Sequence, residues 1–322
     1  MTPHGAGDAG KRRKRPRPTL AHRLEFYAMR GTIGALRALS WDRAVAIGAK
    51  LGALGYRPLG IRKRVVERQI AAAFPELSPR DVIDLAKESY RHLGRSSIET
   101  ALLGSIGKQG LTKLVDTVEG WEMLEQALAR GKGIVLVTGH MGNWELGGAY
   151  IAARGVPLDA IGRGMANPLF DAYINRSREE MGITVVHDSE AVRRTPRSLR
   201  AGRAVGFVAD QGVLGLASTF VPFFGRPAKT PRGPAVFALR FGVPVLFVVA
   251  IRKPNGRYRL VFERVEITGT GDKDRDVDAI VARYTELLER WVRLEPAQYF
   301  WQHRRWKRQP PDTPSELRDP SA

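Results

Sequence analysis

The chain has 322 residues, 43% of them hydrophobic, which is enough for one large α/β domain or for a domain with an added lobe. Its 52 Lys and Arg residues outnumber 33 Asp and Glu, and the formal net charge of +19 predicts attraction to nucleic acid, an anionic membrane leaflet or an acidic protein. Cysteine is absent, which excludes a disulfide framework, a thiolate nucleophile and a Cys-based metal site.

Residues 1–19 predict a disordered basic tail, because a Gly-rich start is followed by a dense basic block at 11–18. No continuous apolar run follows this block, so a secretory signal is not expected. A spanning helix needs about 20 mostly apolar residues. The longest uncharged stretch, 211–225, is shorter and contains Pro222, so we expect no spanning helix.

Residues 20–60 predict an amphipathic helical region. Phe26, Met29, Ile33 and Leu36 share one helical face, and arginines recur every seven residues along its border. Such a helix can lie in a membrane interface with its arginines reaching phosphates, or it can pack on a core with solvated arginines. The helix alone leaves both alternatives open, and the basic block before it favours the membrane.

Two further helical stretches follow, and the second begins at Ser78, a good N-cap. From Gly133 onward, short β-branched runs alternate with helical segments, and an edge strand is expected at 257–267. This pattern predicts an α/β fold with a mainly parallel central sheet flanked by helices, after a helical N-terminal region. We expect the α/β domain to span 61–308 and a disordered tail to occupy 309–322.

The clearest chemical signal follows the apolar strand expected at 134–137. His140 stands between Gly139 and Gly142, and Glu145 comes five residues later, near a helix start. Open α/β sheets bind substrates at the carboxyl ends of their strands. A carboxylate on one imidazole nitrogen would fix the tautomer and stabilise the protonated ring, which suits a general base. The alternative is that His140 is only a hydrogen-bonded residue of a turn, but the preceding strand, the flanking glycines and Glu145 together favour a catalytic role.

The stretch from His140 to Glu145 resembles the His-x4-Asp/Glu motif of the lysophospholipid acyltransferase superfamily. Its fuller form, His-x-Gly-Asn-Trp-Glu, is similar to the lipid A late (lauroyl/myristoyl) acyltransferases and to their relatives that acylate phosphatidylinositol mannosides. The resemblance covers about 62–310. It includes residues 73–76, 167–169 leading to Arg178, 210–211, 220–225 and 298–305.

The resemblance implies transfer of an acyl chain from a carrier thioester to a hydroxyl. His140 would deprotonate the acceptor hydroxyl, and Glu145 would orient and charge-balance the imidazole. Arg178 would stabilise the oxyanion, with Arg163 as the second choice. Asp210, which ends the strand expected at 204–209, would support the site or bind the acceptor, and a loop-capping role remains as plausible.

The resemblance also indicates substrate-binding residues. Phe223 could wall an acyl pocket, although aromatics in such a run are more often core. Basic and hydroxyl side chains follow where the family binds phosphate groups, and the tail cluster 304–308 with Trp301 and Trp306 could anchor at a membrane interface or be solvated. The substrate-binding candidates are Asn143, Arg163, Gln211, Phe223, Lys229, Thr230 and Arg232.

The expected partners are acyl carrier protein or acyl-coenzyme A as donor, a membrane lipid as acceptor, and the membrane surface itself. A lipid A precursor is the first choice of acceptor, and another glycolipid, a phospholipid or an aminolipid is the alternative. We expect a peripheral or monotopic protein on the cytoplasmic face of the inner membrane, with neither metal nor cofactor. A hydrolase would need a Gly-x-Ser-x-Gly or His-Glu-x-x-His motif, and neither occurs. A nucleic-acid-binding protein would explain the charge, but no signature of such a fold accompanies it.

Overall fold

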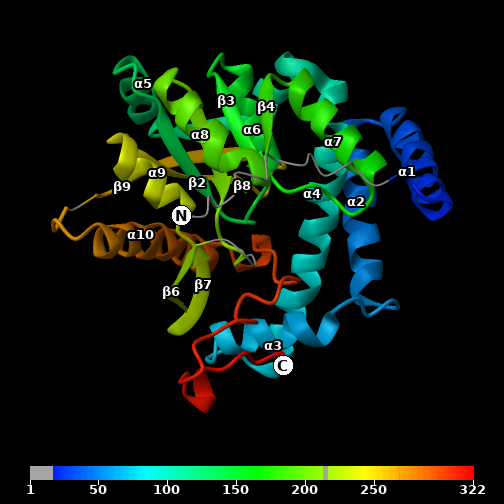
Figure 1. Ribbon diagram of the computed structural model, residues 1–322. Helices are drawn as coiled ribbons and strands as arrows, with labels where there is room; N and C mark the ends of the chain where they lie inside the picture. The colour runs from blue at the N-terminus through cyan, green and yellow to red at the C-terminus, as the bar shows by residue number, and fades with distance from the viewer. Residues whose placement is uncertain (1–16, 213–216, 268) are drawn as a thin grey trace, which may run out of the picture.

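The computed structural model describes residues 17–212, 217–267 and 269–322, and its centre is a seven-stranded sheet (Figure 1). The strand order is β1-β9-β8-β2-β5-β3-β4, and only the β8–β9 pair is antiparallel within the described sheet. The predicted α/β class with a mainly parallel sheet is thereby confirmed. The strands are β1 Val115–Glu119, β2 Ile134–Thr138, β3 Leu158–Gly162, β4 Ile183–His187, β5 Ala204–Val208, β8 Val245–Arg252 and β9 Tyr258–Val265.

Strand β9 is not at an edge. It pairs antiparallel with β8 on one side and parallel with β1 on the other, so the expectation of an edge strand at 257–267 is wrong. The edge belongs to β1, which is half exposed and carries the polar residues Asp116, Thr117 and Glu119. Because these residues are polar, the sequence of β1 lacks the apolar run by which the buried strands are predicted.

The apolar strands are buried on both faces, which is why they read as continuous runs. In β2, Val135 and Val137 point to a core shared with α8 (Ala191–Arg200), α9 (Gly233–Phe241) and α10 (Lys273–Leu294). Ile134 and Leu136 point to the other core, shared with α5 (Trp121–Ala129) and α6 (Trp144–Ala153). Helix α7 (Pro168–Glu180) lies beside β4, and a separate hairpin of β6 (Ser218–Phe223) and β7 (Arg226–Pro231) packs on α10.

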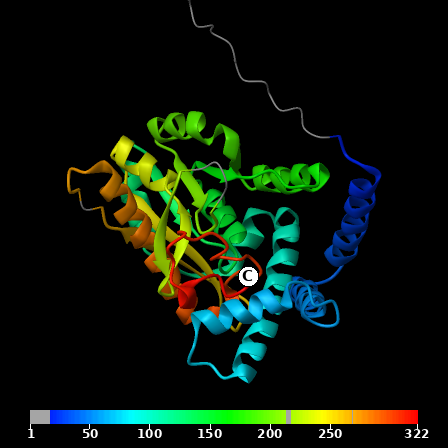
Figure 2. The same cartoon turned by 60° about the horizontal axis from the view of Figure 1, so that its bottom comes forward.

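The N-terminal region is helical, as predicted: α1 Leu20–Arg37, α2 Trp41–Tyr56, α3 Lys63–Ala73 and α4 Pro79–Leu114. Helices α2 and α4 touch through backbone, because a Cβ on Gly94 would lie only 2.0 Å from the carbonyl oxygen of Gly48. Helix α2 is therefore an integral layer of the protein, whereas α1 lies at its margin (Figure 2).

The apolar face of α1 that the sequence marks out packs inward. Ile33 and Leu36 are buried, Met29 packs beside them, and Phe26 contacts the aromatic rings of Phe170 and Tyr173 on α7. For this face, the core-packed alternative holds. None of the helices in the described part of the chain combines the length and apolar character needed to cross a bilayer.

The C-terminal segment, residues 296–308, is part of the core. Trp301 and Trp306 are both 0% exposed, so the expectation that they anchor the protein in a membrane interface is wrong. The remaining residues, 309–322, for which a disordered tail is expected, return to the domain. Arg226 donates to the Glu316 carbonyl at 2.7 Å, and Arg304 pairs with Asp319 at 2.6 Å. The chain ends near α3 (Figure 1).

Candidate active site

The loop that carries His140 joins the carboxyl end of β2 to α6. Gly142 has φ +60°, and a Cβ there would lie 2.0 Å from the Ala250 carbonyl oxygen, so only glycine fits this turn. Asn143 ends the loop by accepting the Leu146 amide at 3.0 Å, which caps α6. The sequence motif thus encodes one sharp turn and one helix cap, which fix His140 before the cap and Glu145 after it.

The C-terminal segment supports this loop from outside. The Gly142 amide donates to the Gln298 carbonyl at 2.9 Å, and the Phe300 amide donates to the His140 carbonyl, also at 2.9 Å. Met141 and Tyr299 form an isolated antiparallel bridge. The loop is therefore held by residues more than 150 positions away in the chain.

The imidazole of His140 is paired with Asp210. His140 Nδ1 lies 2.6 Å from Asp210 Oδ1, and the His140 amide donates to Oδ2 at 3.1 Å. Asp210 lies two residues after the end of β5, the parallel neighbour of β2, and His140 lies two residues after the end of β2, so both residues lie at the same edge of the sheet. This contact leaves Nε2 of His140 for substrate, and the His140 side chain is 23% exposed.

Asp210 is held as a carboxylate. Burial alone would raise the pKa of its side chain, but the charge of His140, the hydrogen bonds that His140 donates and the charge of Arg305 together lower this pKa to about 2. A buried carboxylate of this kind fixes the imidazole tautomer and stabilises the imidazolium.

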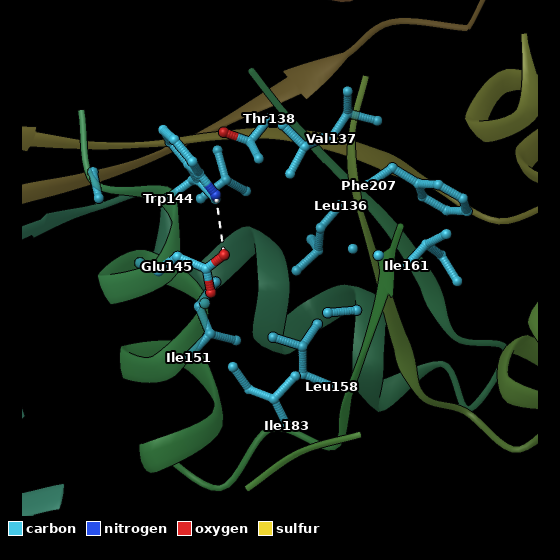
Figure 3. Close-up of a pocket in the computed structure, with 18 of the residues that line it drawn as sticks. Leu136, Val137, Thr138, Trp144, Glu145, Ile151, Leu158, Ile161, Ile183 and Phe207 are labelled. Atoms are coloured by element: carbon cyan, nitrogen blue, oxygen red, sulfur yellow. Dashed lines mark hydrogen bonds between the residues drawn. The ribbon is translucent and has the colours of Figure 1, made fainter. Parts of the chain in front are cut away.

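Glu145 faces away from this pair. It accepts Arg178 Nε at 2.9 Å and Nη2 at 2.5 Å. It also accepts Trp144 Nε1 at 3.2 Å (Figure 3). The expectation that Glu145 is the carboxylate partner of His140 is thus corrected, because Glu145 belongs to the first turn of α6 and its side chain reaches α7. Asp210 takes the position at Nδ1 instead.

Most of the N–H groups of Arg178, the expected oxyanion donor, already donate to protein side chains. Two of its nitrogens donate to Glu145 and the third, Nη1, donates to Asn175 at 2.9 Å. Three of its five N–H bonds are thus directed at protein groups. The guanidinium is rigidly placed, and its remaining N–H bonds are those that a substrate could use.

Two hollows meet at Trp144 and Glu145. The first, here called the catalytic cleft, runs between α1 and α4 on one side and the His140 loop on the other. Its wall is mostly apolar. Its lining residues include Met29, Ile33, Leu93, His140, Glu145 and Phe300.

The second hollow, here called the inner cavity, lies between the sheet and α6. Glu145 and Trp144 stand at one side of it, and the other labelled side chains, Thr138 apart, are aliphatic or aromatic (Figure 3). Three glycines, Gly147, Gly148 and Gly206, help to keep it open. An apolar slot of this kind accepts a hydrocarbon chain.

The remaining candidates lie apart from these hollows or serve the fold. Phe223 is fully buried and packs against Tyr299 and Trp306, and Thr230 is buried with its hydroxyl 2.6 Å from Arg305 Nη2. The Lys229 carbonyl accepts Arg305 Nη1 at 2.7 Å.

The charge of Arg232 is taken by two carboxylates of α10, Asp274 at 2.7 Å and Asp278 at 2.8 Å. Arg163 is exposed and Gln211 is half exposed, and Asn143 is buried under the loop. The structure therefore forms two pairs, His140 with Asp210 and Glu145 with Arg178, and the catalytic cleft is lined by one member of each, His140 and Glu145. Arg163 and Arg232 belong to neither pair.

Three residues near Asp210 are missed by the sequence analysis: Tyr299, His303 and Arg305. Arg305 is 3% exposed, and burial lowers the pKa of His303 to about 4 although Asp210 opposes this. Burial also keeps the pKa of Tyr299 well above its usual value, so its hydroxyl stays protonated next to Asp210. All three residues lie in the stretch 298–305, whose resemblance to the family could have indicated them. Within the described residues, no three His, Cys, Asp or Glu side chains are grouped to hold a metal ion.

A His–Asp pair thus lies at the carboxyl edge of an α/β sheet beside an apolar cavity, which is the place where open α/β sheets bind their ligands. The chain belongs to the bacterial lipid A biosynthesis acyltransferase family, whose model matches residues 14–308, and it is an O-acyltransferase.

Named relatives cover most of the chain. The lipid A biosynthesis lauroyltransferase of Escherichia coli (strain K12) is 26% identical over 287 residues, which are 88% of this chain and 92% of the relative. The palmitoleoyltransferase of the same strain is 28% identical over 266 residues, 82% of this chain and 85% of the relative. The phosphatidylinositol mannoside acyltransferase of Mycobacterium tuberculosis (strain ATCC 25618 / H37Rv) is 27% identical over 296 residues, 88% and 91% of the two chains.

Proposed function

We propose that this enzyme transfers a fatty acyl chain from a thioester of acyl carrier protein or coenzyme A to a hydroxyl of a membrane glycolipid, with a lipid A precursor as the first choice. The observation that carries the mechanism is the 2.6 Å contact between His140 Nδ1 and Asp210 Oδ1. It supports a general base whose second nitrogen faces the catalytic cleft.

In the proposed reaction, Nδ1–H of His140 donates to Asp210 and Nε2 accepts the proton of the acceptor hydroxyl. The hydroxyl oxygen then attacks the thioester carbonyl carbon and forms a tetrahedral intermediate. As the intermediate collapses, the C–S bond breaks and the imidazolium returns its proton to the departing thiolate. The ionised Asp210 stabilises the imidazolium between these two steps.

Arg178 and Glu145 form the second part of the proposed machinery. Glu145 holds the guanidinium of Arg178 by two contacts, so the remaining N–H bonds of Arg178 have a fixed direction. Arg178 lines the inner cavity, next to Glu145, which lines both hollows. A preorganised cation at this point would stabilise the oxyanion of the tetrahedral intermediate. In this proposal Glu145 acts on Arg178 and not on His140.

The inner cavity is proposed to hold the acyl chain of the donor. Its apolar wall suits a hydrocarbon, and its polar side, at Glu145 and Arg178, suits the thioester end. The lauroyl and palmitoleoyl groups in the names of two relatives are chains of this kind.

The acceptor is proposed from the named relatives. Lipid A precursors and phosphatidylinositol mannosides are both glycolipids of the membrane, and the two E. coli relatives favour the former. We propose that the enzyme reaches such acceptors as a peripheral or monotopic protein on the cytoplasmic face of the inner membrane. Mass spectrometry of lipids from a deletion strain would identify the acceptor, because the missing acyl group marks it directly.

His140→Ala is the test of the mechanism. We expect a folded protein whose transfer rate is lower by about 10³-fold or more, since only binding and oxyanion stabilisation remain. The matched control is His187→Ala, which removes an exposed imidazole from the last residue of β4 and should leave the rate unchanged. Near-normal turnover of the purified His140→Ala enzyme would contradict the mechanism.

A further inference from the structure

Glu99 is a buried carboxylate without a role in the mechanism described so far. It lies on α4, is 0% exposed, and accepts hydrogen bonds from three side chains of other elements: Asn143 Nδ2 at 3.1 Å, Arg252 Nη1 and the Tyr258 hydroxyl. All three groups donate, so the site fits a carboxylate and not a carboxamide. Isolated buried charges are costly, and here Arg252 provides the counter-charge.

Asn143 connects this network to the catalytic loop. Its Oδ1 caps α6 through the Leu146 amide, its Nδ2 donates to Glu99, and its own amide donates to the Ala250 carbonyl at 2.9 Å. The residue is 1% exposed and lies three positions after His140 and two before Glu145. Its side chain therefore sets the point at which the loop ends and α6 begins.

Helix α4 holds the loop at a second point about two turns earlier, at His92. His92 Nε2 lies 3.1 Å from the Gly142 carbonyl oxygen, and the hydroxyl of Ser96 lies 3.2 Å from the same nitrogen. Arg252, the counter-charge of Glu99, also exchanges backbone hydrogen bonds with the Gln298 side chain, and the Gln298 carbonyl accepts the Gly142 amide. One buried network thus reaches both sides of the turn between His140 and Glu145.

We propose that Glu99 is a positioning residue of acyl transfer: through Asn143 it fixes the start of α6, and so holds the Glu145–Arg178 pair in its place relative to His140. The inference rests on the proposed general-base mechanism. In this inference, a residue outside the motif keeps the Glu145–Arg178 pair at a fixed position relative to the His140–Asp210 pair. Small misplacements of catalytic groups reduce rates strongly.

The chain offers a matched control for the cost of removing a buried charge. Asp159 on β3 is also buried and accepts bonds from Arg203 Nε at 2.8 Å and from the Ser198 hydroxyl, but it lies near the amino end of its strand, away from the His140 edge. Glu99→Gln and Asp159→Asn should both lower the free energy of unfolding. Only Glu99→Gln should lower kcat, by about 10-fold or more at nearly constant KM, because the donor and acceptor pockets remain.

A milder variant guards against a Glu99→Gln chain that does not fold. Asn143→Ser keeps a capping oxygen for α6 but removes the amide that donates to Glu99, and it should lower kcat in the same direction. In the double variant the two losses should not add, because both break one contact. Equal kcat values for Glu99→Gln and Asp159→Asn, or additive losses with Asn143→Ser, would overturn the proposal. An active His140→Ala enzyme would instead overturn the mechanism on which it rests.

Discussion

Helix α1 and the C-terminal segment look alike in sequence and differ in structure. Both combine arginines with large apolar side chains, and both allow a membrane anchor. In the structure, Trp301 and Trp306 are completely buried, whereas Leu20, Leu24 and Tyr27 of α1 are 73%, 65% and 67% exposed. An amphipathic pattern shows that one face will be covered, but it does not show whether protein or lipid covers it.

The charges of the two segments differ in the same way. Arg305 of the C-terminal segment lies over the Phe223 ring at 5.3 Å, binds the backbone of β7 and acts on Asp210. The arginines of α1 are exposed, and Arg30 touches only the ring face of Tyr173 at 5.3 Å among the contacts described. The guanidinium of Arg305 therefore interacts with groups inside the protein, whereas the arginines of α1 remain available to an external anion.

The largest expected effect is on stability. Trp306→Ala should lower the free energy of unfolding by about 3–5 kcal/mol, because it leaves a large cavity among Phe223 and its neighbours. Tyr27→Ala, an aromatic deletion on α1, should change it by less than about 0.5 kcal/mol. Urea denaturation of both variants measures the difference. Equal losses would abolish the contrast between the two segments.

Much of the fold follows from the sequence, because strands buried on both faces have a distinctive composition. The strand expected at 134–137 is a continuous apolar run, and the structure confirms it as β2. Strand β1 and the β6–β7 hairpin are missed, since β1 is polar and half exposed and the hairpin contains Pro222, Pro227 and Pro231. Local pattern is weakest where tertiary contacts decide the structure.

The proposed general base, His140, is predicted from its loop, but its carboxylate partner is not. Glu145 is five residues away in sequence, and Asp210 is seventy. Only the pairing of β2 with β5 brings Asp210 to Nδ1, and a pairing between strands is not written in either strand alone. The same limit hides Arg305 and Glu99, whose partners lie on distant elements.

A second, smaller effect concerns acid. The pKa of Asp210 is lowered from 3.8 to about 2, so its stabilising contribution is complete above about pH 4 and is lost as the pH falls toward 2. A shift of nearly two units corresponds to roughly 2 kcal/mol. Asp210→Asn should therefore flatten the fall in unfolding free energy between pH 4 and pH 2.

The control for this pH series is Asp312→Asn, which removes an exposed carboxylate from the C-terminal residues. Its profile should follow that of the parent enzyme. If Asp210→Asn instead fell as steeply as the parent, the buried pair with His140 and the nearby Arg305 would contribute nothing to acid stability. The internal use of charge in the C-terminal segment would then lose its support.

The smallest effect on stability is expected at α1, where the effect on membrane binding should be large. Leu20, Leu24 and Tyr27 follow one another at helical spacing and form an exposed stripe, with exposed Arg23 and Arg30 beside it. Replacing the three stripe residues by Gln should leave the free energy of unfolding within about 0.5 kcal/mol. It should weaken binding to phosphatidylglycerol-containing vesicles by about 10-fold or more, since apolar insertion and charge attraction add in free energy.

The control replaces three exposed apolar residues that lie on other elements, Ile83, Val192 and Leu294, by Gln. Vesicle co-sedimentation at low and high salt separates the two contributions, because salt weakens only the attraction of the arginines. Deletion of residues 1–38 is a stronger form of the same test. A cut at residue 57 is unsuitable, because it removes α2 and its backbone contacts with α4. Unchanged binding of the stripe variant, with or without salt, would show that α1 is as closed to the membrane as the C-terminal segment.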